Sequence, residues 1–135
     1  MSILGKMMHK GAALLPAAGI ASSLAAQDVA VPSGAKIALF DVIIEAAPPV
    51  ARFRFVAPQI GTGDGSLGFE DVADDIQYLC DDIARPALLD NDWREGQIVI
   101  SLSGQETAFG EPAPDVTQFF QPFTLSADRC IWEDF

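Results

Sequence analysis

The sequence has 135 residues, a formal net charge of −11 and two cysteines, and half of its residues are hydrophobic. This length corresponds to one domain, and this apolar content is enough for a modest core, which excludes a disordered chain. The strong negative charge excludes nucleic acid as a partner, because two polyanions repel each other.

Residues 1–26 have the organisation of a secretory signal peptide. Lys6 and Lys10 precede an uncharged apolar run, and small residues close that run. The run is too short for a membrane-spanning helix, which needs about 20 residues. We therefore expect cleavage before Ala26 or before Gln27, followed by export to the periplasm.

Cleavage changes the chemistry that the mature chain has available. His9, the single histidine, leaves with the signal, together with two of the eight cations and none of the acids, so the formal net charge becomes −13. The mature chain then has no histidine to activate a nucleophile or to ligate a metal ion. We predict a protein that is not an enzyme and holds no cofactor.

The mature chain begins with a predicted linker at residues 27–34, which ends in a turn signal, and continues as a single domain at residues 35–135. Residues 37–45 are rich in β-branched and aromatic side chains and predict a first strand. Residues 51–57 alternate in character, which predicts a half-buried second strand, paired antiparallel with the first.

The second predicted strand carries two arginines on one of its faces. Phe53 and Phe55 point to the other face, which we assign to the core. Arg52 and Arg54 therefore lie side by side, where they would contact either an anion or the acidic side chains nearby.

The loop that follows, at residues 58–68, contains the tetrapeptide GDGS, and Asn91 follows the GDG after 25 residues. This spacing resembles the thiamine-diphosphate signature, which implies that Asp64 and Asn91 are magnesium ligands. Enzymes with that signature have several hundred residues of parallel α/β structure and a second domain that supplies a glutamate. We interpret the match as a coincidence of glycine-rich turn chemistry, with no metal bound.

Residues 69–84 have apolar side chains at helical spacing and predict the main helix. The rest of its surface is acidic. This surface either keeps the protein soluble or binds a basic protein of the cell envelope by charge complementarity. The side chains that we assign to such a docking surface are Asp74, Asp75, Tyr78, Asp81 and Asp82.

Cys80 and Cys130 are the two cysteines, and both lie in the exported part. An even number of cysteines in an oxidising compartment predicts a disulfide. The bond would close a loop of about 50 residues and contribute on the order of 4 kcal/mol to stability. The alternatives are two buried free thiols or bridges between chains.

The remaining part predicts two strands, at residues 98–103 and 106–109, then a short helix at 115–121 and a final strand at 129–133. The order is β-β-α-β-β followed by the short helix and the C-terminal strand. It favours an α+β fold, in which a small antiparallel sheet has the main helix packed on one face as a two-layer sandwich.

Aromatic residues are frequent near the C-terminus. We predict that they lie in the core, although an exposed apolar patch that seats a partner is the alternative. The residues concerned are Phe119, Phe120, Phe123, Trp132 and Phe135.

Three short segments, together with the signal peptide, resemble a family of small exported bacterial proteins of unknown function. They are AFGE at 108–111, TQFF at 117–120 and RCIWEDF at 129–135. The resemblance covers most of the mature chain. It implies an envelope location and a cysteine pair between helix and tail, and it supplies no catalytic residue.

We therefore expect a non-catalytic exported domain that binds or accompanies another envelope protein. Two alternatives remain open. One is a fragment of a thiamine-diphosphate- and magnesium-dependent enzyme, and the other is a small-molecule carrier, which would need an apolar cavity.

Overall fold

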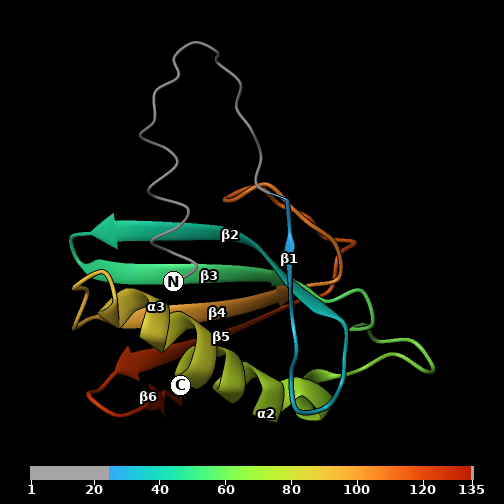
Figure 1. Cartoon of the computed structure of the whole chain (residues 1–135). Coiled ribbons are helices and arrows are strands. Elements are labelled where there is room, and N and C mark those ends of the chain that lie inside the picture. Colours follow the sequence, from blue (N-terminus) through green and yellow to red (C-terminus); the bar gives the residue numbers. More distant parts are fainter. Residues whose placement is uncertain (1–24, 135) are drawn as a thin grey trace.

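The structure is a computed structural model that describes residues 25–134 (Figure 1). The predicted signal peptide therefore lies outside the described residues, except for its last two positions. Six strands form one mixed sheet in which spatial order follows sequence order. They are β1 (Gln27–Val29), β2 (Ile37–Ala46), β3 (Pro49–Val56), β4 (Gln97–Ser103), β5 (Gln118–Leu125) and β6 (Cys130–Trp132).

A helical segment connects β3 to β4 and packs against one face of the sheet (Figure 1). It consists of α2 (Phe69–Tyr78), the π-helical η1 (Leu79–Ala84) and α3 (Arg85–Leu89). A sheet combined with a helical segment confirms the α+β class in outline, although the sheet dominates. Among residues 25–134, no helix is long and apolar enough to cross a membrane.

The prediction of a purely antiparallel sheet is wrong at one pair of strands. β3 and β4 run parallel, whereas the other neighbouring strands are antiparallel. The reason is the helical segment between them, because a helix that crosses the sheet returns the chain to the edge from which it left.

The predicted linker also contains regular structure, because β1 lies within residues 27–34 and pairs with the start of β2. A buried carboxylate fixes the turn that follows β1. The backbone N–H and the hydroxyl of Ser33 donate hydrogen bonds to the two carboxylate oxygens of Asp75 in α2, at 3.0 and 2.5 Å. This turn is therefore part of the packed structure.

The main helix is longer than predicted. Helical structure continues through α3 to Leu89, with Pro86 in the first turn of α3. The wider turns of η1 end at Ala84, two residues before this proline. A π-helical turn replaces the i→i−4 hydrogen bonds of the α-helix by wider ones. The backbone before Pro86 is therefore already rearranged at the point where proline, which has no N–H, would interrupt the α-helical hydrogen bonds.

The sequence prediction for residues 104–125 is wrong. Residues 106–109 form no strand, and β5 occupies the region where a short helix was predicted. β5 tolerates Pro122 because the carbonyl of Pro122 accepts the Glu133 N–H, on the β6 side. The nitrogen and carbonyl of one residue in a strand point to the same side, so the proline leaves the hydrogen bonds to β4 intact.

The core lies between the helical segment and the sheet. The alternating patterns of β3 and β4 are confirmed, since their core-facing side chains are fully buried, as is Phe123 of β5. The helical segment contributes apolar side chains from all three of its parts. The central members of the cluster are Phe53, Phe55, Ile98, Ile100, Leu102, Phe123, Val72, Ile76, Leu79 and Leu88.

A disulfide joins Cys80 of η1 to Cys130 of β6, which is the predicted pair. Two hydrogen bonds support it. The Cys130 N–H donates to the Asp81 carboxylate at 2.7 Å, and the Gln77 side-chain amide donates to the Cys130 carbonyl at 3.0 Å. The helical segment is therefore fastened to the last strand by a covalent bond and by polar contacts.

Candidate functional site

The sheet has a second face, opposite the helical segment, which we call the open face. Cross-strand pairing places three of its side chains in one row, because Arg54 of β3 pairs with Ser101 of β4, and Ser101 pairs with Phe120 of β5. Residues 104–117 connect β4 to β5 and fold over part of this face. We call this connection the covering loop.

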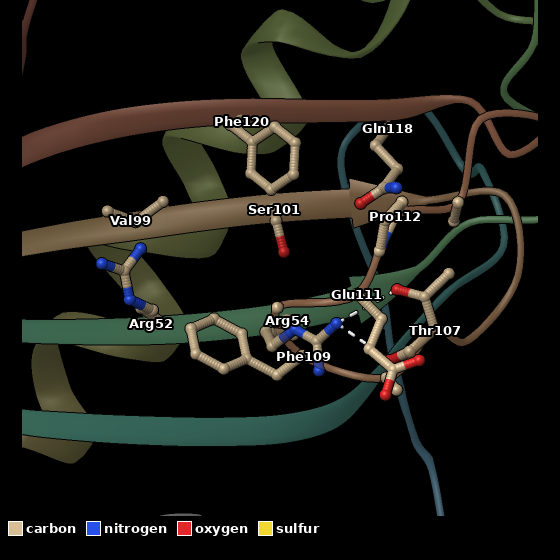
Figure 2. A pocket seen from close by; sticks show the side chains of 13 residues that line it. Arg52, Arg54, Val99, Ser101, Thr107, Phe109, Glu111, Pro112, Gln118 and Phe120 are labelled. Atoms are coloured by element: carbon tan, nitrogen blue, oxygen red, sulfur yellow. Dashed lines mark hydrogen bonds between the residues drawn. The ribbon is translucent and has the colours of Figure 1, made fainter.

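A cavity of ≈ 320 Å³ lies between the open face and the covering loop (Figure 2). Its volume is at the lower end of the range for small-molecule sites, roughly 300–1,000 Å³. Charged, polar and aromatic side chains line it. Those named in Figure 2 are Arg52, Arg54, Val99, Ser101, Thr107, Phe109, Glu111, Pro112, Gln118 and Phe120.

Arg54 fastens the covering loop to the sheet. Its Nη1 donates to Asp41 of β2 at 2.7 Å, and its Nη2 donates to the Thr107 carbonyl and hydroxyl oxygens at 2.9 and 3.1 Å. Its guanidinium carbon lies 4.9 Å from the ring centre of Phe40 and 5.4 Å from that of Phe109. Because Arg54 is buried and has these partners, its role at this site is to position the loop.

Arg52 has more free capacity. Within the described residues, its guanidinium makes one hydrogen bond, from Nη2 to the Glu45 carboxylate at 3.2 Å. A guanidinium carries five N–H groups, so most of its donors are unused there. Its Nε is buried and has no hydrogen-bond partner. Its guanidinium carbon lies over the Phe109 ring, 5.6 Å from the ring centre. Both arginines thus contact nearby acids, as one of the two sequence interpretations expected.

Two phenylalanines of the site are exposed to solvent, with exposed fractions of 50% for Phe109 and 60% for Phe120. The prediction that Phe120 lies in the core is wrong. Its neighbours Phe119 and Phe123 point to the other face, where Phe123 packs edge-on against Trp132. Phe135 lies outside the described residues.

The acidic surface of α2 and η1 is less continuous than the sequence indicates. Asp74 and Asp82 are exposed, but Asp75 is 1% exposed and bound to Ser33. Asp81 is half-buried and holds the Cys130 N–H, and Tyr78 is also half-buried. Two of the five side chains assigned to a docking surface thus have structural partners inside the protein.

The two residues of the thiamine-like motif, Asp64 and Asn91, do not come together in the fold. Asp64 lies in the loop before α2, and Asn91 follows α3. The helical segment between them runs from Phe69 to Leu89, which corresponds to about 30 Å at about 1.5 Å per residue. The Asn91 side-chain amide donates to the Ala87 carbonyl. Asp64 and Asn91 are therefore too far apart to ligate the same ion.

Within the part of the chain that the structure describes, no three side chains of the metal-ligating types come together. A sequence model for a family of unknown function (DUF6497) matches residues 13–135. The chain belongs to this family. Membership of DUF6497 confirms the predicted resemblance to a family of unknown function and assigns no activity. Neither a curated protein nor a solved structure matches the chain.

Sequence analysis identified Arg52 and Arg54 but missed the rest of the cavity. The covering loop contributes Thr107, Phe109 and Glu111, and an expected strand at residues 106–109 obscured this role. The one local signal was the density of glycine and proline at residues 110–114, which is typical of an irregular connection.

Proposed function

We propose that this DUF6497 protein is an exported, non-catalytic binding domain, and that the cavity under the covering loop is its binding site. The observation that supports this most directly is the cavity itself, with an underused arginine and two exposed phenylalanines in its walls. A concave site with apolar walls and a few polar groups is the usual form of a ligand site. The cavity favours a small-molecule carrier over a protein that binds its partner through the acidic surface of the helix.

The composition of the cavity supports binding without catalysis. Its charged side chains are Arg52, Arg54 and Glu111. Arginine keeps its proton in proteins and cannot serve as a general base. The Ser101 hydroxyl lies in the wall with no histidine or lysine among the lining residues, and the one lining carboxylate, Glu111, is exposed and makes no hydrogen bond to it.

Export is supported by the predicted signal peptide and by the disulfide, which is typical of oxidising compartments. An intact-mass measurement on the protein recovered from its native cell tests this step. A mass that corresponds to a chain starting at Ala26 or Gln27, minus two hydrogens for the disulfide, is the expected result. A full-length mass with two free thiols would contradict export.

Binding can be tested with anilinonaphthalene sulfonate, an aromatic anion whose fluorescence rises in apolar sites. We expect the mature protein to bind it saturably with 1:1 stoichiometry. The Phe120→Ala variant should bind at least about fivefold more weakly, because it removes an aromatic wall. Ile44→Ala is the matched control, since Ile44 is also exposed but lies outside the cavity. Absence of saturable binding, or equal weakening by both variants, would contradict the proposal.

A further inference from the structure

We infer that the cavity takes a short peptide with free ends, whose carboxylate contacts Arg52 and whose ammonium group contacts Glu111. This inference rests on the proposed function, since it names the class of ligand for the same cavity. It depends on three features: a cation with spare donors, an unpaired carboxylate on the far side of Phe109, and an unpartnered polar group between them.

The first feature is the position of the spare cation. Arg52 uses one N–H of its guanidinium, toward a half-exposed Glu45, within the described residues. Its remaining donors suit a carboxylate, because guanidinium and carboxylate form charge-assisted hydrogen bonds. Arg54 is less available, since Asp41 and Thr107 already bind its terminal nitrogens.

The second feature is the carboxylate of Glu111. This exposed side chain lines the cavity and makes no ion pair or hydrogen bond with a described residue. In Figure 2 it lies beside Thr107, and the Phe109 ring separates it from Arg52. A ligand with one charge at each of its two ends suits charged groups on the two sides of the Phe109 ring better than an amino acid, whose charged groups share one carbon.

The third feature is Ser101, which lies in the floor between these two ends (Figure 2). It is 5% exposed, and its hydroxyl makes no hydrogen bond within the described residues. Because this hydroxyl has no partner among the described residues, a ligand in the cavity can replace its water with a direct hydrogen bond. The nearby Gln118 amide adds donors and an acceptor. Peptide groups between the two charged ends match both side chains.

The overall charge also favours a zwitterion over a multiply charged anion. Arg52 and Arg54 each have an acidic partner, and Glu111 adds a negative charge to the cavity. The whole chain carries a formal charge of −11, which disfavours a ligand with several negative charges. A peptide with free ends has no net charge, and its apolar side chains would contact Phe109 and Phe120.

Isothermal titration calorimetry with trileucine tests the inference. We compare the free peptide with its C-terminal amide and its N-acetyl form, each of which removes one charge. We expect each modification to weaken binding about tenfold, because each removes one charge-assisted contact. Arg52→Gln should abolish the effect of amidation alone, and Glu111→Gln should abolish the effect of acetylation alone. Glu106→Gln is the matched control, an exposed glutamate of the covering loop outside the cavity.

The outcomes separate this inference from the proposed function. Equal binding of all three peptides, or an effect of only one modification, would overturn the peptide assignment. If trileucine fails to bind while the aromatic sulfonate binds in a manner that depends on Phe120, the peptide assignment is wrong and the binding function stands. If neither ligand binds, both proposals fail.

Discussion

Replacing Cys80 and Cys130 by serine should lower the free energy of unfolding by about 4 kcal/mol, because the disulfide closes a loop of about 50 residues. For a domain of this size the loss corresponds to a fall in Tm of roughly 15 °C. The fold itself should survive, since the hydrogen bonds from Gln77 and to Asp81 still hold the backbone of residue 130.

Calorimetry with and without reductant measures this effect. Reductant should lower the Tm of the unmodified mature protein to that of the double variant and should leave the double variant unchanged. Equal Tm values for the two proteins under oxidising conditions would contradict a stabilising disulfide between helix and tail.

Phe53→Ala should destabilise the protein by about 3–5 kcal/mol, whereas Phe120→Ala should change stability by less than about 1 kcal/mol. The two side chains lie on opposite faces of the sheet: Phe53 is fully buried against the helical segment, and Phe120 is mostly exposed. Chemical denaturation monitored by circular dichroism compares the two variants directly. A large loss from Phe120→Ala would show that the open face is covered in solution.

The strands that could be predicted from the sequence are those with a local, period-two pattern. The alternating segments 51–57 and 98–103 coincide closely with β3 and β4, and the apolar side chains on their core-facing side are buried. The faces of Arg52 and Arg54 followed from the same alternation. Such a pattern depends on neighbouring residues alone and survives into the folded structure.

Pairing between distant segments could not be predicted in the same way. The direction of β4 relative to β3 depends on the path of the helical segment, and the short helix predicted at residues 115–121 obscured β5. Asp75 has the spacing of an exposed helical residue, yet the turn at Ser33, 42 residues earlier, covers it. The residues next to Asp75 in the sequence therefore give no sign of the distant segment that buries it.

The cavity is also formed by segments that are far apart in the sequence. Arg54 meets Thr107 across 53 residues of sequence, and Phe109 reaches both arginines only because the covering loop folds back over the sheet. The sequence therefore indicated the arginines as candidates for binding an anion, but not the cavity in which they lie.

Amide chemical-shift mapping of the ¹⁵N-labelled mature protein, titrated with anilinonaphthalene sulfonate, tests most directly whether the cavity under the covering loop is the binding site. The largest perturbations should appear at the amides of residues 107–111 and of Ala113, Arg52, Ser101 and Phe120, and they should saturate together. Perturbations confined to α2 and η1, or spread evenly over the molecule, would contradict the assignment of the open face as the binding surface.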